Sequence, residues 1–277
     1  EKGFFLMVEG SKVDWAAHAN DPVGIVSDIL SFDKAVETGL AYAKKHKDTV
    51  IIVTTDHGNS GITIGNQQTT SGYDKIHIDE YVKPLKAAKY TGEGAEKMLT
   101  ADRSNIESTM KEYYGISDLT PEEIAKIKGA EAGSLNYVVG PMMAERAKIG
   151  FTTGGHTGED VILGVYAPDG NRPTGVIDNT DIAAYIANTL DVDLAEAIDQ
   201  LFVKADAAFA AKGATVKLDE TDPKNPILQG QKGGHELELP LDKSIGSLNG
   251  KPVQLKGLVV HNTLDVYVPQ DAIDLIQ

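Results

Sequence analysis

Apolar residues along the first part of the chain are grouped in two ways, which predict strands alternating with a helix. Residues 4–8 are a continuous apolar run of strand length, typical of a strand buried on both faces. From residue 31 to 47 the apolar positions follow helical spacing, with Ser31 as the expected N-cap and lysines at the C-terminal end. Residues 49–54 are rich in β-branched side chains and predict the next strand.

A strand, a helix and a strand within about fifty residues are typical of a βαβ unit. We therefore predict an α/β fold with a mostly parallel central sheet flanked by helices. Such sheets bind ligands beyond the carboxyl ends of their strands. Glu9 follows the first predicted strand, and Asp56 and His57 follow the second, so these three side chains are expected near a site.

The middle of the chain has a different character. Residues 73–130 are rich in Lys and Glu, follow a helical pattern and include a good helix start at Pro121, so we predict a helical insertion there. The pattern predicts further helices at 134–148, 181–190 and 194–211, and a buried strand at 160–167.

From about residue 213 the chain becomes rich in turns, and short segments alternate between apolar and polar residues. The strands expected in this part span residues 236–241, 252–260 and 264–268. The expected organisation is a partial α/β domain at 1–212, which carries the insertion, and a β-rich C-terminal extension at 213–277.

The composition argues against several classes of function. The 277 residues carry a net charge of −15, which argues against a general nucleic-acid-binding surface. A transmembrane helix needs about 20 consecutive apolar residues. No apolar run in the sequence is that long, so no transmembrane segment is expected. The chain has no cysteine, which excludes disulfides, cysteine nucleophiles and thiolate zinc sites.

The chain starts at Glu1, directly before an apolar strand and without an initiator methionine. This start suggests a fragment or a processed chain, and any export signal would lie upstream. If part of the sheet is supplied from elsewhere, the remaining apolar surface is expected to be exposed or covered in a homodimer.

The segment from Glu9 to His18 has the densest set of metal-binding side chains. Asp14 and His18 are four residues apart, so on a helix both lie on one face, where two ligands can converge. A carboxylate with an imidazole suits zinc, and the harder carboxylate of Glu9 suits magnesium. The pattern is short, however, and a solvated helix start is an open alternative.

Two further motifs lie next to predicted strands, one after a strand and one before a strand. Asp56 and His57 directly follow a buried strand, where polar groups need partners; alternatively, Asp56 caps an ordinary turn. His156 lies among small residues in 152–158, which lets its ring project into a cavity; alternatively, it is an exposed histidine in a glycine-rich turn. Structural or surface roles are expected for the other histidines, which are His46, His77, His235 and His261.

The three motifs together are more specific than any one of them. They supply six oxygen and nitrogen donors, which are Glu9, Asp14, His18, Asp56, His57 and His156. Three protein ligands with an open fourth position make a catalytic zinc site, so this set is enough for one zinc site and parts of two more.

The motifs and their order resemble the alkaline phosphatase family. The resemblance runs through Val8-Glu9-Gly10-Ser11-Lys12-Val13-Asp14 to His18, then Thr54-Thr55-Asp56-His57, then His156-Thr157-Gly158, and covers roughly residues 3–66 and 150–190. It implies an alkaline phosphatase-like fold. The insertion at 73–130 resembles that family's variable crown region.

The resemblance also implies roles for individual residues. Asp14, His18 and His156 would bind a first zinc, Asp56 and His57 a second zinc, and Glu9 a magnesium ion. Trp15 would lie near the phosphate pocket, or else it serves only in packing.

The activity implied is hydrolysis of phosphate monoesters through a phosphoserine. The family's nucleophilic serine and its remaining ligands precede residue 8, and Ser60 does not match that serine, so the chain is expected to be inactive alone. A phosphate dianion is repelled by a net charge of −15, yet two zinc ions would add +4 at the pocket.

Two alternatives remain open. A cofactor-independent phosphoglycerate mutase of the same metal-dependent superfamily also carries a stretch like Asp56 to Asn59. A non-catalytic metal-binding module that packs on a partner chain is the other. The resemblance further implies a periplasmic, secreted or cell-surface protein.

Overall fold

The computed structural model describes residues 3–276, and it divides into two compact units. The first unit ends at Pro173 and the second begins at Thr174. The predicted domain division at 212/213 stays a prediction.

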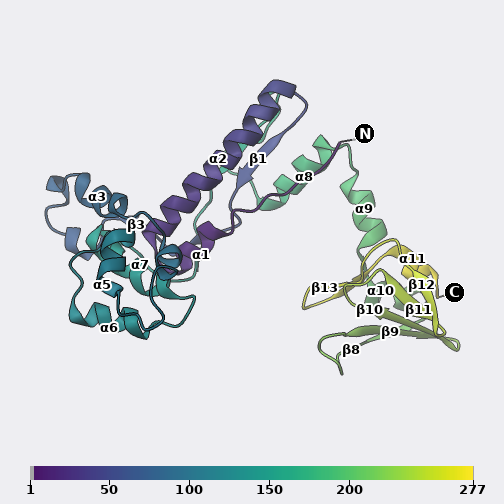
Figure 1. Cartoon of the computed structure of the whole chain (residues 1–277). Coiled ribbons are helices and arrows are strands. Elements are labelled where there is room, and N and C mark those ends of the chain that lie inside the picture. The colour runs from purple at the N-terminus through teal and green to yellow at the C-terminus, as the bar shows by residue number, and fades with distance from the viewer. Residues whose placement is uncertain (1–2, 277) are drawn as a thin grey trace. The chain divides into compact units, whose positions relative to one another are not determined.

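The first unit opens with two helices, α1 (Lys12–His18) and α2 (Pro22–His46) (Figure 1). The expected helix start at Ser31 is wrong. The cap is Asp21, whose carboxylate accepts a hydrogen bond from the Val23 amide, and Pro22 occupies the first turn. Aspartate before proline is a strong start signal, and nothing in residues 22–30 interrupts the helix before Ser31.

The paired strands of the first unit are short. Strand β1 (Ile51–Thr54), which lies beside α2 in Figure 1, pairs with β6 (Leu163–Tyr166). Two smaller ladders join β2 (Gly58–Asn59) to β5 (His156–Thr157) and β3 (Thr63–Ile64) to β4 (Ile149–Gly150). The strands predicted near 49–54 and 160–167 are confirmed.

The prediction of a mostly parallel sheet is wrong. Every pair of named strands in residues 3–276 is antiparallel. The predicted strand at 4–8 belongs to no ladder, and its side chains are 63–76% exposed. The parallel βαβ unit required this segment as a partner for β1, so without that pairing the unit does not close.

The helical character predicted for residues 73–130 is confirmed. The insertion contains α3 (Asp79–Ala87), α4 (Gly92–Glu96), α5 (Ile106–Thr109), the π-turn η3 (Met110–Tyr114) and α6 (Pro121–Gly129). Two single turns, η1 (Gln67–Thr69) and η2 (Tyr73–Lys75), precede it, and α7 (Leu135–Arg146) follows it. Its core is built from side chains of these helices together with one from α2, including Val23, Met110, Tyr114, Ile127, Leu135 and Val139.

The second unit starts with α8 (Asn179–Thr189) and α9 (Leu194–Leu201). The helix predicted over 194–211 is interrupted by β7 (Val203–Lys204) and resumes as α10 (Ala205–Ala211). The interruption arises because residues 203–204 pair with β14 (Val266–Val268). This pairing partner lies over sixty residues away, so helical periodicity does not reveal it.

The β-rich character of the C-terminal part is confirmed. A five-stranded antiparallel sheet has the order β12-β11-β10-β9-β8. Its strands are β8 (Thr215–Asp219), β9 (Ile227–Lys232), β10 (His235–Pro240), β11 (Ile245–Leu248) and β12 (Lys251–Gln254). Strand β13 (Val260–His261) pairs with β14, and α11 (Gln270–Asp274) follows. The strand predicted at 252–260 is therefore two short strands, β12 and β13. The core includes Phe209, Leu228, Leu237, Leu239 and Ile273.

Candidate metal centre

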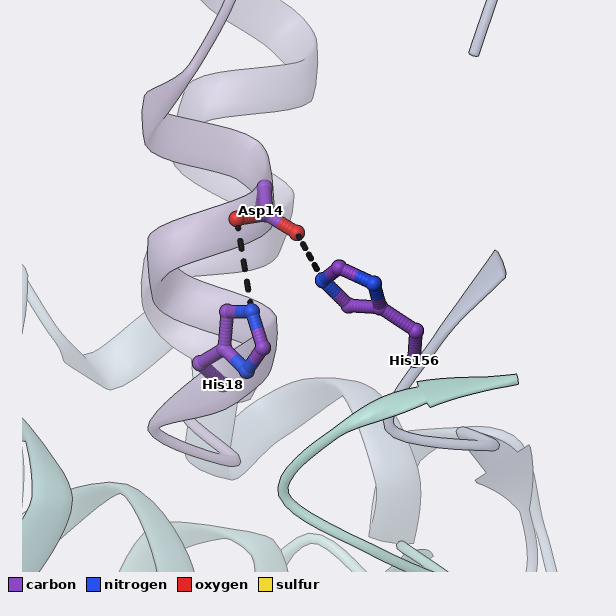
Figure 2. Close-up of side chains that lie close together, drawn as sticks. All are labelled: Asp14, His18 and His156. Carbon is purple, nitrogen blue, oxygen red and sulfur yellow. Dashed lines mark ion pairs between the residues drawn. The ribbon is translucent and has the colours of Figure 1, made fainter. Parts of the chain in front are cut away.

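Three of the predicted ligands come together beside α1. Asp14 and His18 lie one turn apart on α1, and His156 approaches them from β5 (Figure 2). The distances from the Asp14 carboxylate are 3.5 Å to His18 Nε2 and 3.9 Å to His156 Nε2. One ligand atom from each residue lies within 4.8 Å of the others. The i, i+4 spacing of Asp14 and His18 therefore places both side chains on one face of α1, as expected.

The hydrogen bond of His18 prepares its ring for a metal. Its Nδ1 lies 2.7 Å from the Gly154 carbonyl oxygen. A carbonyl accepts only, so Nδ1 is the donor in this bond and Nε2 is the ring nitrogen turned toward Asp14. A backbone carbonyl on the far nitrogen is the arrangement found behind metal-binding histidines. Gly154 comes from the loop before His156, so the two ligand-bearing segments support each other.

The second motif lies next to the first. The His57 ring stacks on the His156 ring, with centroids 3.5 Å apart and planes inclined by 20°. His57 Nδ1 donates to the Gly58 carbonyl at 2.9 Å, which leaves Nε2 facing the Asp56 carboxylate at 3.2 Å. Asp56 and His57 thus form a second pair of donors adjacent to the first group.

Backbone contacts fix the loops that carry His57 and His156. Besides the β2–β5 ladder, the Ser60 amide donates to the Gly155 carbonyl at 2.8 Å, and the Thr152 amide donates to the Ser60 carbonyl at 2.9 Å. Ser60 is fully buried at a φ of 59°, in the left-handed region. Ser60 therefore joins the two loops through its backbone.

One contributor was not singled out from the sequence. The side-chain amide of Asn59 donates to Asp14 Oδ1 at 2.6 Å, so it orients a predicted ligand. Its position directly after Asp56-His57-Gly58 is a weak signal for such a role. Its partner lies 45 residues away, which no local pattern reveals.

Glu9 and Trp15 lie outside this group. Glu9 is exposed and is not among the clustered ligand atoms of the described residues. Trp15 is 52% exposed, and the Lys12 ammonium lies 4.0 Å above its ring while also pairing with Glu93. The ring is thus partly accessible to solvent, with one face covered by Lys12.

The donor set fits zinc. One carboxylate and two imidazoles make a three-ligand site with an open fourth position. Ligand atoms around a tetrahedral zinc lie about 3.3 Å apart, so the three side chains would have to move closer together when the metal binds. Glu9, the predicted magnesium ligand, lies outside the group of Asp14, His18 and His156. It directly follows residues 4–8, which pair with no strand.

Comparison with known proteins identifies the family of the chain. A family model described as alkaline phosphatase matches residues 1–192. The chain is 38% identical over 199 residues to alkaline phosphatase 3 of Bacillus subtilis, covering 69% of this chain and 41% of that protein. It is 31% identical over 219 residues to the repressible alkaline phosphatase of Saccharomyces cerevisiae, covering 71% and 38% respectively.

A solved structure is also similar. The crystal structure of a cold-active alkaline phosphatase from the psychrophile Shewanella sp. matches with a TM-score of 0.58 and 28% identity, covering 69% of this chain and 46% of that one. These relatives and this structure are all phosphatases, which defines the class. The chain belongs to the alkaline phosphatase family. It spans about two fifths of the length of the curated relatives it matches.

No helix among residues 3–276 has both the length and the apolar character that crossing a membrane requires.

Proposed function

We propose that this chain supplies zinc-binding side chains of a metal-dependent phosphate monoester hydrolase that acts through a phosphoserine. The observation that carries the proposal is the convergence of Asp14, His18 and His156, with His57 stacked on His156. The family to which the chain belongs supports the same activity.

In this proposal Asp14, His18 and His156 hold one zinc, Asp56 and His57 a second, and Glu9 a magnesium ion. Bound zinc supplies positive charge for a phosphate dianion and activates the attacking oxygen. The protein's own residues prepare the site.

The hydrogen bonds around these ligands favour this arrangement. The Gly154 carbonyl keeps the His18 proton on Nδ1, and the Asn59 amide orients the Asp14 carboxylate. The half-exposed Trp15 ring offers an apolar surface beside Asp14 for the alcohol portion of a substrate.

Zinc titration of the purified chain tests the ligand assignment. We expect His156→Ala to weaken zinc binding by at least tenfold in isothermal titration calorimetry, because it removes one of three ligands. His235→Ala is the matched control, since His235 is an exposed histidine of the second unit. Equal zinc affinity in the wild type and His156→Ala would contradict the assignment.

We also propose that the chain alone does not turn over an aryl phosphate, because no serine in it has been assigned as nucleophile. Robust phosphate release by the purified chain would contradict this. The mutase alternative predicts phosphoryl isomerisation without release in a protein that spans the full length of these relatives. A non-catalytic module predicts zinc binding with neither reaction.

We propose two further properties of the protein, its oligomeric state and its location. The exposed apolar segment 4–8 favours self-association, so we propose a homodimer. The resemblance favours a periplasmic, secreted or cell-surface location. Fractionation of the native cell, with a cytoplasmic marker enzyme as control, tests the location.

A further inference from the structure

A buried carboxylate that the proposed mechanism does not use lies three residues after His18. Asp21 is 1% exposed. Its Oδ1 accepts hydrogen bonds from the Tyr114 hydroxyl at 2.7 Å and from the Val23 amide at 3.0 Å. Its Oδ2 accepts from the Gly92 amide at 3.3 Å. One side chain thus binds the start of α2 and two elements of the helical insertion.

The backbone of the same residue terminates α1. The Asp21 amide donates to the Ala16 carbonyl at 3.0 Å, and the Asn20 amide donates to the Ala17 carbonyl at 2.8 Å. Asn20 adopts a left-handed φ of 50° between them. The end of the helix that carries His18 is therefore held by the residue that contacts the insertion.

The backbone segments around Asp21 pack closely against one another. A Cβ atom added to Gly140 of α7 would lie 2.7 Å from the Asp21 Cα. One added to Gly92 of α4 would lie 2.7 Å from the Asn136 Cα. Helix α7 thus packs directly on the backbone of Asp21, and α4 of the insertion packs on the backbone of α7, so a shift of the insertion is transmitted to the end of α1.

Capping α2 does not by itself require a buried carboxylate. Serine caps a helix about as well as aspartate and avoids the cost of a desolvated charge. Burial raises the pKa of Asp21. The contacts that a serine is too short to make are those to Tyr114 and Gly92, both in the insertion.

We propose that Asp21 is a positioning residue that sets the direction of His18 and couples the helical insertion to the metal centre. The inference rests on the proposed function, in which His18 binds zinc. It gives the insertion a role in metal affinity although no residue of the insertion is among the proposed ligands.

Zinc affinity separates this role from a purely structural one. Asp21→Ser keeps a cap for α2 but loses the contacts to the insertion. We expect it to weaken zinc binding about tenfold, the lower end of what supporting residues around metal ligands contribute. Tyr114→Phe, which removes a single hydroxyl, is the mild variant and is expected to fall between Asp21→Ser and the wild type.

Thr120→Ala is the matched control. It removes the capping box of α6, also within the insertion, and does not touch α1. We expect it to lower thermal stability while leaving zinc affinity within twofold of the wild type. Equal zinc affinity in Asp21→Ser and Thr120→Ala would overturn the proposal, because both would then act through stability alone.

Hydrogen exchange without metal distinguishes failure of this inference from failure of the proposed function. We expect the Asn20 amide to exchange at least tenfold faster in Asp21→Ser than in the wild type, with no such change in Thr120→Ala. If the wild type and His18→Ala bind zinc equally, the proposed function fails. Unchanged exchange at Asn20 would overturn the role of Asp21 whatever the zinc result.

Discussion

The side-chain amide of Asn59 donates a 2.6 Å hydrogen bond to the carboxylate of Asp14. The bond joins β2, which follows the Asp56-His57 motif, to α1, which carries two of the clustered ligands. A donor held against a ligating carboxylate restricts its orientation before a metal binds. Asn59 is therefore expected to contribute to metal affinity.

Asn59→Leu is expected to weaken zinc binding by about 10–100-fold, because Asp14 loses the group that orients it. Calorimetric titration of the folded variant measures the effect. Asn225→Ala, in an exposed turn of the second unit, is the control and should leave zinc affinity unchanged. An Asn59→Leu affinity equal to that of the wild type would show that Asp14 needs no such support.

Glu9→Gln is expected to leave the zinc affinity of this chain unchanged. The reason is that Glu9 is exposed and outside the group formed by Asp14, His18 and His156. Asp14→Asn, measured in the same titration, is the positive control and should lower zinc affinity at least tenfold. A comparable loss in Glu9→Gln would mean that Glu9 reaches the zinc site in solution.

The ion pair between Glu123 and Arg146 is expected to make stability depend on acid pH. The guanidinium donates to both carboxylate oxygens at 2.7 and 2.8 Å. These bonds lower the pKa of Glu123 below its usual value of 4.5. Because the folded-state pKa is lowered, the stabilisation is present above pH 4.5 and is lost as pH falls through the lowered pKa.

Glu123→Gln should therefore lower the free energy of unfolding by about 1.5 kcal/mol at pH 7, with the difference from the wild type shrinking below pH 4.5. Urea unfolding followed by the fluorescence of Trp15, the single tryptophan, reports on the first unit alone. Glu122→Gln, at the exposed neighbouring position, is the control and should stay within about 0.5 kcal/mol of the wild type. A pH-independent difference would contradict the ionic origin.

The apolar segment at residues 4–8 is expected to drive concentration-dependent association. Its five side chains are contiguous and 63–76% exposed, and exposed apolar patches favour association. The double substitution Leu6→Ser with Met7→Ser should shift sedimentation-velocity profiles toward monomer. Leu264→Ser removes an isolated exposed side chain and should change nothing. A wild type that stays monomeric at all concentrations would contradict this prediction.

Local patterns predicted much of the element content. The helix at 134–148 and the strand at 49–54 form close to their predicted bounds, because apolar spacing and β-branched content act within a few residues. Strand direction was not predictable in the same way. Strand β1 pairs with β6 more than a hundred residues later, and no spacing rule near Ile51 contains that information.

The candidate site, too, was predicted in part from local patterns. Asp14, His18, Asp56, His57 and His156 were identified from residue type and spacing. The structure clusters Asp14, His18 and His156, stacks His57 on His156 and pairs Asp56 with His57. The roles of Asn59 and Asp21 were not predicted, because their hydrogen-bond partners lie 45 and 93 residues away along the chain. Side-chain bonds over such separations leave no periodic trace along the chain.

The sequence by itself determined which chemical groups are available, in what order, and on which kinds of element, because these depend on side chains and on contacts within a turn or two. Only the tertiary structure decided which groups meet, that the paired strands run antiparallel, and that segment 4–8 lies exposed. These outcomes depend on contacts between segments far apart in the chain, whose free energies are set by packing and hydrogen bonding across the whole fold.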